Sequence, residues 1–272
     1  MTKPNKDTHQ LTNKKLSIQI CLSGLSFCIL DSQHTVTYLK HFSKHRNLNP
    51  LELLDYLKFI IDTETPLKET FNQVTVIYRN DLATVVPKDL FRENNLADYL
   101  KFNSKILHTD FVSYDELDTQ PLVLVYVPLV NINNFIYDTF GAFTYKHFAT
   151  VFIEQTLTYK TDNSTETMFV NVGENLFEVV VLNQGKLLLY NAFSYATKED
   201  FIYYILFTAE QLKLNPESFK LIFTGNISRN DSLFEIAYKY IRFVDLCEVS
   251  HTLQFTTEIP EPHENMVLLN SF

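Results

Sequence analysis

The hydrophobic pattern of the first eighty residues predicts three strands, a helix and a fourth strand. Strand-like patterns of apolar and polar positions occur at 16–22, 25–31 and 35–42. A helix is expected from Pro50, because Asn49 is a favourable cap and proline fits the first helical position. Its apolar positions recur every three or four residues, which predicts one buried face. The apolar run at 74–78 then predicts a strand covered on both faces.

The second half of the chain repeats this order. Strand patterns occur at 168–172, 176–182 and 186–193. Thr197 and Asp200 resemble a capping box that starts a helix. Patterns of a strand, a helix and a strand follow at 219–223, 232–240 and 243–249. The tail at 263–272 is expected to contain a last short helix.

The middle of the chain has a weaker pattern. Helices are expected at 94–100 and 133–140, the second capped by an asparagine, and strands at 106–112 and 122–127. The stretch at 150–160 has helical spacing but many β-branched residues, so that helix and strand both stay open there.

The two halves also keep similar spacings. The helix cap follows Gly24 by 25 residues in the first half and follows Gly173 by 24 residues in the second. The next strand follows these glycines by 50 and 48 residues. Two matching intervals in the same element order indicate an internal duplication.

Two βββαβ halves, each with a polar turn after its first strand, resemble the actin-like ATPase superfamily. The stretch 171–193 (NVGENLFEVVVLNQGKLLLYNAF) looks like the second phosphate-binding element of that superfamily, and 21–31 (CLSGLSFCILD) lies where the first would be. The whole chain resembles a family of uncharacterised bacterial proteins, a domain of unknown function with an actin-like, ribonuclease H-like fold. The resemblance implies an α/β protein of two lobes, each with a mixed five-stranded sheet flanked by helices. We expect subdomains at 16–148 and 149–272, after a disordered segment at 1–15.

The resemblance also implies a cleft between the lobes. There, backbone N–H groups would hold the phosphates of ATP, and an aspartate in each turn would manage a magnesium ion. In this chain Leu22 takes the place of the first aspartate and offers no oxygen, while Asn171 takes the second and lacks the charge. The loop at Gly225 has one glycine, although the adenosine loop of the superfamily is usually glycine-rich. The expected cleft residues are Gly24, Asn171, Gly173, Glu174 and Gly225.

These departures favour a non-catalytic binding or scaffold protein with no catalytic residues, no metal site and no resident cofactor. Two alternatives stay open, and the first of them needs a carboxylate in a displaced position, from Asp31 or Glu174. One is a weak ATPase or kinase that uses ATP with magnesium. The other is a protein that binds a nucleotide or another small ligand in the cleft without turnover.

Charge and composition limit the classes of partner and the compartment that we expect for the protein. Lys and Arg number 23 against 32 Asp and Glu, and this net charge of −9 disfavours nucleic acid. Residues 1–15 lack the apolar core of a signal peptide, and the apolar run at 121–130 is too short to span a bilayer, so no stable membrane insertion is expected. Three cysteines at unmatched spacings fit reduced thiols in the cytoplasm.

The remaining polar and aromatic features have simpler interpretations. His41 and His45 are expected to be surface histidines, because no other ligand completes a metal site near them. The acidic run at 115–118 is interpreted as a solvated loop. Tyr203 and Tyr204 cannot both point into the core, so an exposed tyrosine there is expected to anchor a protein partner of unknown identity.

Overall fold

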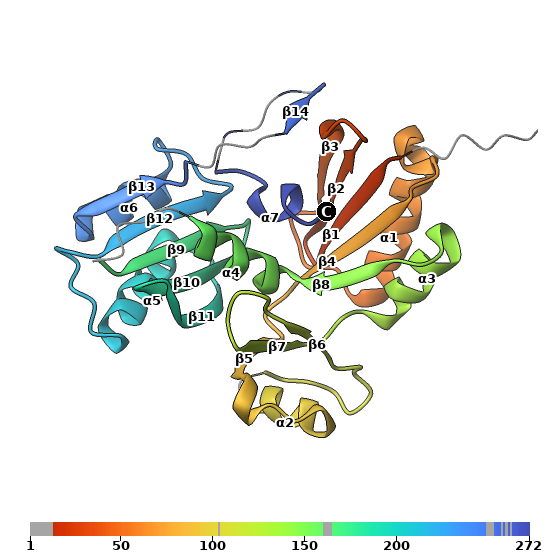
Figure 1. Cartoon of the computed structure of the whole chain (residues 1–272). Helices are drawn as coiled ribbons and strands as arrows, with labels where there is room; N and C mark the ends of the chain where they lie inside the picture. The colour runs from red at the N-terminus through yellow and green to blue at the C-terminus, as the bar shows by residue number, and fades with distance from the viewer. Residues whose placement is uncertain are drawn as a thin grey trace, which may run out of the picture.

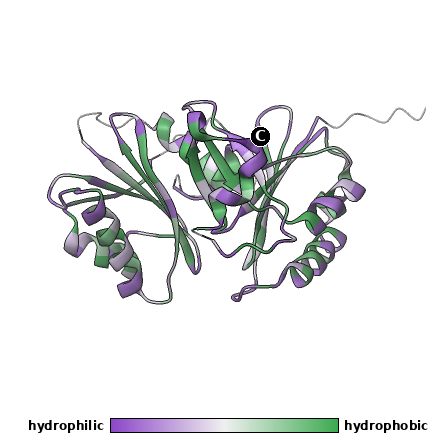
Figure 2. Ribbon diagram, turned by 90° about the horizontal axis from the view of Figure 1, so that it is seen from below, coloured by the Kyte–Doolittle hydropathy of each residue, from purple (hydrophilic) through white to green (hydrophobic). Residues whose placement is uncertain are grey.

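The computed structural model describes residues 13–102, 104–159, 165–248, 253–256, 258, 261 and 263–272. Within them two α/β lobes lie side by side, and a smaller three-stranded sheet lies below their junction (Figure 1). Figure 2 shows hydrophobic residues along the strands and a mixture of hydrophobic and hydrophilic residues on the outer helices, as expected for helices that bury one face. None of the helices in this described part has both the length and the apolar character that crossing a bilayer requires.

The first lobe contains the three strands, helix and strand expected near the N-terminus. Its strands are ordered β3-β2-β1-β4-β8, with β1 antiparallel to β2 and parallel to β4. The helix α1 begins with a capping box in which Asn49 and Glu52 each bond the backbone N–H of the other. The elements are β1 (Lys15–Cys21), β2 (Gly24–Leu30), β3 (Thr35–Ser43), α1 (Pro50–Thr63), a 3₁₀ turn (Thr65–Lys68), β4 (Gln73–Arg79), α3 (Val130–Phe140) and β8 (Thr144–His147).

The second lobe repeats the first. Its strands are ordered β11-β10-β9-β12-β13, again with the first strand of the repeat, β9, antiparallel to β10 and parallel to β12. The matching order confirms the duplicated fold of two mixed sheets, in which five strands of the first correspond to the five of the second. The elements are β9 (Thr167–Val172), β10 (Leu176–Asn183), β11 (Lys186–Ser194), α5 (Lys198–Gln211), β12 (Lys220–Gly225), α6 (Ser232–Tyr240) and β13 (Phe243–Leu246).

The smaller sheet is inserted between β4 and β8 of the first lobe. Its strands are ordered β5-β7-β6, and α2 packs against β5 and β7. The elements are β5 (Ala83–Pro87), two 3₁₀ turns (Lys88–Leu90 and Glu93–Asn95), α2 (Leu96–Leu100), β6 (Ser113–Glu116) and β7 (Leu122–Tyr126).

Three expectations for the middle of the chain are wrong. The stretch 106–112 is a loop, because the Asp110 carboxylate accepts the backbone N–H of Leu107 and closes a turn. Asn133 does not cap a helix: α3 starts at Val130, and the Asn133 side chain instead accepts a hydrogen bond from Tyr78 Oη. Asp115 is not in a solvated loop. It lies in β6 and accepts hydrogen bonds from Tyr126, Thr150 and the backbone of His147.

The stretch at 150–160, which the sequence left open, contributes to the helix α4 (Phe148–Thr158) at the junction of the lobes. Phe152 of α4 is completely buried in a single core that also includes Phe169 and Val180 of the second lobe. This helix therefore packs one face of the second sheet into the core of the first lobe, while the residues of α5 and α6 form a separate core with the second sheet.

The C-terminal segment returns to the first lobe, although its position in the chain placed it in the second subdomain. The short strand β14 (Gln254–Phe255) pairs with β3, so the first sheet gains a sixth strand. The expected last helix is α7 (Met266–Leu269), whose four residues are buried against α4, β1 and β2. At the other end, residues 1–12 of the segment expected to be disordered lie outside the described residues, and Lys15 begins β1.

Candidate functional site

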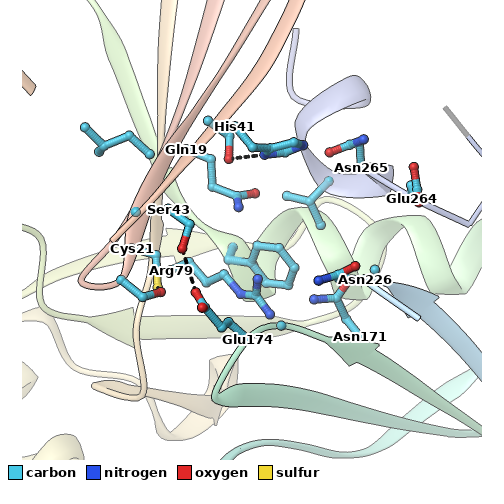
Figure 3. Close-up of a pocket in the computed structure, with 18 of the residues that line it drawn as sticks. Gln19, Cys21, His41, Ser43, Arg79, Asn171, Glu174, Asn226, Glu264 and Asn265 are labelled. Atoms are coloured by element: carbon cyan, nitrogen blue, oxygen red, sulfur yellow. Dashed lines mark hydrogen bonds between the residues drawn. The ribbon is translucent and has the colours of Figure 1, made fainter. Parts of the chain in front are cut away.

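A cavity of about 350 Å³ lies between the lobes, where β1, β4, β9 and β12 end. All five residues expected in the cleft line it, namely Gly24, Asn171, Gly173, Glu174 and Gly225. The C-terminal segment contributes a further wall through Glu264, Asn265, Met266 and Val267 (Figure 3). The repeated turns at Gly24 and Gly173 therefore line the same cavity, as the resemblance implies.

Close backbone contacts explain why glycines occur at the edges of the cavity. A Cβ atom added to Gly24 would lie 2.5 Å from the carbonyl oxygen of Phe42 on β3. Gly225 has a φ of +84°, and a Cβ atom there would lie 2.4 Å from the carbonyl oxygen of Val172. These glycines let neighbouring backbone segments approach each other.

A buried ion pair joins the two lobes beside the cavity. Arg79, the last residue of β4, donates from Nε and Nη2 to the two carboxylate oxygens of Glu178 on β10, at 2.6 and 2.7 Å. The side chains are 13% and 1% exposed, respectively. Burial by itself lowers the pKa of Arg79, but the charge and hydrogen bonds of Glu178 outweigh it, and the net pKa is raised above its ordinary value.

The guanidinium of Arg79 also fills the space over the second turn. It stacks on the Phe148 ring at 4.8 Å from the ring centre. A Cβ atom added to Gly173 would lie 2.7 Å from Arg79 Nη2, so the cation rests directly against this glycine. The space that a phosphate would need at the turn is therefore narrowed by a charged group of the chain itself.

The Asn171 side chain is hydrogen-bonded within the interior of the second lobe. Its Nδ2 donates to Glu178 at 2.9 Å, and its Oδ1 accepts from Thr224 Oγ1 at 3.1 Å. Both ends of the amide are thus used by buried partners. The Asn171 side chain thus belongs to a chain of hydrogen bonds that runs from Arg79 through Glu178 and Asn171 to Thr224.

Glu174 bridges the lobes at the rim of the cavity. Its carboxylate accepts a hydrogen bond from Ser43 Oγ at 2.7 Å and pairs with His45 Nδ1, both in or just after β3. These partners lower the pKa of Glu174 below its ordinary value. The displaced carboxylate considered from the sequence is therefore in the cleft, but other groups already hold it. The second candidate, Asp31, caps the turn after β2 through the backbone of Gln33 and Thr35 and does not line the cavity.

His41 is exposed, as expected, and Leu22 differs from its expected setting. His41 lines the cavity and bonds Ser26 Oγ at 2.6 Å. The cavity walls desolvate the imidazole and lower its pKa, although part of the ring reaches solvent. Leu22 does not face this cavity. It lines a second cavity of about 490 Å³, which shares Arg79 and Cys21 with the first.

The residues present are a poor match to magnesium-bound ATP. Magnesium prefers free anionic oxygens, whereas Asn171 and Glu174 are already bonded within the protein. In the part of the chain that the structure describes, no three His, Cys, Asp or Glu side chains group as a metal site would need.

Arg79 and Glu178 were not predicted from the sequence, although a local feature of the sequence marks each of them. Glu178 lies within an otherwise apolar strand, 176–182, and a charge at a buried position requires a partner. Arg79 directly follows the buried strand at 74–78. Nothing in the sequence indicates that these two residues, 99 positions apart, bond each other.

Solved structures share this architecture. The chain is similar to a protein of Bacteroides thetaiotaomicron with an actin-like ATPase fold and unknown function, at 22% identity and a TM-score of 0.75, with 89% of this chain and 93% of that chain covered. It is also similar to a structure of the PilM–PilN type IV pilus biogenesis complex, at 11% identity and a TM-score of 0.58, with 94% and 97% covered. The ethanolamine utilization protein EutJ of Carboxydothermus hydrogenoformans matches at 9% identity and a TM-score of 0.50, with 97% and 92% covered. At these identities the likeness shows the fold.

A comparison with functionally curated proteins finds no match. The model of one protein family, by contrast, matches residues 3–244, which is most of the chain. The protein has the actin-like fold and belongs to the family described as "Protein of unknown function (DUF3822)".

Proposed function

We propose that this protein is a non-catalytic member of the actin-like ATPase superfamily that acts as a binding or scaffold protein. The observation that carries the proposal is the ion pair between Arg79 and Glu178. It joins the lobes at the place where the superfamily uses a metal and phosphates, and it lies against Gly173 of the second turn. A contact within the chain thus fixes the lobes without a nucleotide.

The chemistry of the two turns supports the same conclusion. Leu22 offers no oxygen and lines the second cavity, and both ends of the Asn171 amide are bonded internally. Glu174, which follows the second turn, is held by Ser43 and His45. Catalysis of phosphoryl transfer depends on positioning a metal and the attacking group, whereas Asn171 and Glu174 are both already bonded within the protein.

We further propose that the partner is a protein and that the protein acts in the cytoplasm. The similar fold of a chain in the PilM–PilN complex supports a protein partner. The three cysteines are free thiols, and burial raises the pKa of Cys28 and Cys247 to about 12, so both stay protonated. Such thiols suit a reducing compartment. Cell fractionation checks the location, and recovery of the protein outside the cytoplasm would contradict it.

The direct test of the proposal is the response of the intact protein to ATP. We expect isothermal titration with ATP and magnesium to give no saturable binding, and we expect no phosphate release above a protein-free blank. Saturable, magnesium-dependent binding of ATP would overturn the proposal. Phosphate release that disappears on Asn171→Ala or Glu174→Ala substitution would establish the ATPase alternative.

A double-mutant cycle tests whether the ion pair holds the lobes. Arg79→Met leaves the buried Glu178 carboxylate without its cation and is expected to lower the free energy of unfolding by about 3–5 kcal/mol. With Glu178→Gln added, the loss should be smaller than the sum of the single losses, because no unpaired charge stays buried. Denaturant unfolding measures each variant.

The exposed pair of Lys88 and Glu116 is the matched control for this cycle. Its side chains are about half exposed, and Lys88→Met is expected to change stability by less than about 1 kcal/mol. An Arg79→Met variant as stable as Lys88→Met would show that the buried pair does not fix the lobes.

A further inference from the structure

We infer that the outer face of α5 is the docking site for a helix of the partner protein, which carries two apolar residues one turn apart with a Lys or Arg on either side. The inference rests on the proposed function, since it takes the protein to act by binding a protein partner. The site is the row Glu199, Tyr203, Phe207 and Glu210, called here the α5 row, and none of these residues lines either cavity.

The α5 row lies on the outside of the second lobe. The helices α5 and α6 cover one face of the second sheet, and α4 packs against the other (Figure 1). Glu199, Tyr203 and Phe207 follow one another at intervals of four residues, and Glu210 comes three residues later, so that the four side chains share one side of the helix. All four are exposed, with Tyr203 at 58% and Phe207 at 42%. The expected exposed tyrosine is therefore Tyr203, and it belongs to a larger surface.

The aromatic rings of this surface are continuous. Tyr203 stacks on Phe207, with the ring centres 5.9 Å apart, and its edge meets Tyr204 at 5.3 Å. Tyr204 in turn stacks on Phe193 of β11 at 4.8 Å. Four rings thus run from the edge strand of the sheet across α5, and the last two are exposed. Exposed apolar patches of this kind are typical of sites where proteins bind each other.

The matching helix of the first lobe shows that the fold does not require these rings. Both α1 and α5 have fourteen residues and begin with a capping box, so their positions correspond when they are counted from the cap. Asp55 then matches Tyr203, and Tyr56 matches Tyr204. The ammonium group of Lys44 lies 4.0 Å from the centre of the Tyr56 ring and covers it. The same helix position is therefore charged and covered in one lobe, and aromatic and open in the other.

Charge determines the kind of partner. Glu199 and Glu210 lie at the two ends of the row, and neither carboxylate has a hydrogen-bond or ion-pair partner in the part of the chain that the structure describes. Lys198 and Lys213 lie outside the row, before and after it. A second copy of this chain would bring like charges together at the row, whereas Lys or Arg side chains of a partner would pair with both carboxylates.

The spacing of the row determines the shape of the partner. Side chains four residues apart form a ridge on an α-helix, and such ridges pack into the grooves of another helix. A partner helix with two apolar residues one turn apart would contact Tyr203 and Phe207 together. A cation one further turn away on each side would then lie beside Glu199 and Glu210.

Isothermal titration of the intact protein with synthetic peptides tests the inference. The first probe is a helical peptide of about 20 alanine and glutamine residues, long enough to form a helix in water. It contains two leucines four positions apart, with a lysine four positions before the first leucine and another three positions after the second. A second peptide has glutamates in place of the lysines. A third peptide has a proline-rich backbone that carries the same leucines and lysines.

We expect the lysine helix to bind with a dissociation constant below about 1 mM, and the other two peptides to bind at least about tenfold more weakly. No saturation by the lysine helix, or equal binding of the glutamate helix, overturns the inference. Equal or tighter binding of the proline-rich peptide also overturns it, because the occupant would then be an extended segment. Sedimentation of the protein alone should show no dimer that Tyr203→Ala dissociates. Such a dimer would mean that a second copy occupies the row.

Substitutions locate the bound helix. Tyr203→Ala and Phe207→Ala should each weaken binding of the lysine helix by at least about fivefold. Phe59→Ala is the matched control and should leave binding unchanged, because Phe59 of α1 corresponds to Phe207 and is 63% exposed. The double variant with Glu199→Lys and Glu210→Lys keeps the rings and should reverse the preference, so that the glutamate helix binds more tightly. Equal effects of Phe59→Ala and Phe207→Ala, or an unreversed preference, overturn the inference.

The peptide titrations and the response to ATP separate this inference from the proposed function. Binding of the lysine helix together with phosphate release from ATP contradicts the proposed function alone. Absence of peptide binding, together with absence of ATP binding and phosphate release, contradicts the inference alone.

Discussion

Gly225 shows how a single residue controls the geometry of the cavity. Its backbone has a left-handed φ of +84°, its N–H donates to the carbonyl of His263, and the Val172 carbonyl lies against its α-carbon. Gly185, in the hairpin between β10 and β11, has a similar φ of +72° but open space around it. Both glycines therefore adopt a left-handed backbone conformation, but Gly225 is closely packed and Gly185 is not.

Alanine at these two positions separates the two effects. Gly185→Ala should lower the free energy of unfolding by about 1 kcal/mol, the usual cost of a left-handed conformation for a residue with a Cβ atom. Gly225→Ala should cost clearly more, about 2 kcal/mol or above, because the added Cβ atom also clashes with the Val172 backbone. Denaturant unfolding measures both variants. Equal losses would mean that the backbone around Gly225 shifts without strain.

The positions of single functional residues could be predicted where a sequence motif indicated them. The five cleft residues came from the resemblance to the actin-like superfamily, and all five line the cavity. Whether any of them binds a ligand stays a prediction. Arg79 and Glu178 have no repeated motif, and their bond depends on the end of β4 in the first lobe lying close to β10 in the second. The sequence therefore indicated the turns but not the ion pair between them.

Among the elements, α4 is unusual because a buried histidine caps its N-terminus. His147 caps it: its Nδ1 accepts the backbone N–H of Ala149 at 3.1 Å, and the ring is fully buried beside Tyr126. Burial lowers the pKa of His147 from 6.5 to about 3, because the charged imidazolium is costly away from water. The helix that joins the lobes thus begins at a histidine that stays neutral in the folded protein.

This histidine should make stability depend on pH. Between about pH 6.5 and pH 3 the unfolded chain binds a proton at His147 and the folded chain does not. The free energy of unfolding is therefore expected to fall as the pH decreases through this window. Asp115, which accepts the backbone N–H of His147, has a pKa raised by burial and acts in the opposite direction.

The contribution of His147 is isolated by comparing the wild type with His147→Asn, which keeps a capping acceptor and removes the titrating ring. Urea unfolding at several pH values should show a shallower loss of stability for the variant between pH 6.5 and pH 4, while Asp115 is common to both proteins. His108→Asn, at an exposed position, is the control and should keep the wild-type slope. Parallel curves for the wild type and His147→Asn would contradict the assignment.

For the whole molecule, the position of α4 decides how the lobes unfold. Phe152 and its neighbours on α4 pack in one continuous core with residues of both sheets, and the C-terminal segment crosses from the second lobe to the first. Two lobes with separate cores would be able to unfold independently. The shared core makes the stability of each lobe depend on the other.

We therefore expect one calorimetric unfolding transition, with equal calorimetric and van't Hoff enthalpies. Phe152→Ala should destabilise this single unit by about 3–5 kcal/mol, because it opens a cavity in the shared core. Phe207→Ala, at an exposed position on α5, is the control and should change the midpoint little. Two resolved transitions in the wild type would show that the lobes are thermodynamically separate.

The sequence by itself determined the elements of the duplicated fold, because strand alternation, helical spacing, caps and turns are local and recur in both halves. The strand predicted at 106–112 was wrong because the Asp110 side chain closes a turn there. Only the tertiary structure decided that a C-terminal strand and helix return to the first lobe and that Arg79 meets Glu178 between the lobes. Those features depend on contacts between residues far apart in the chain, and such contacts leave no periodic signal in the sequence.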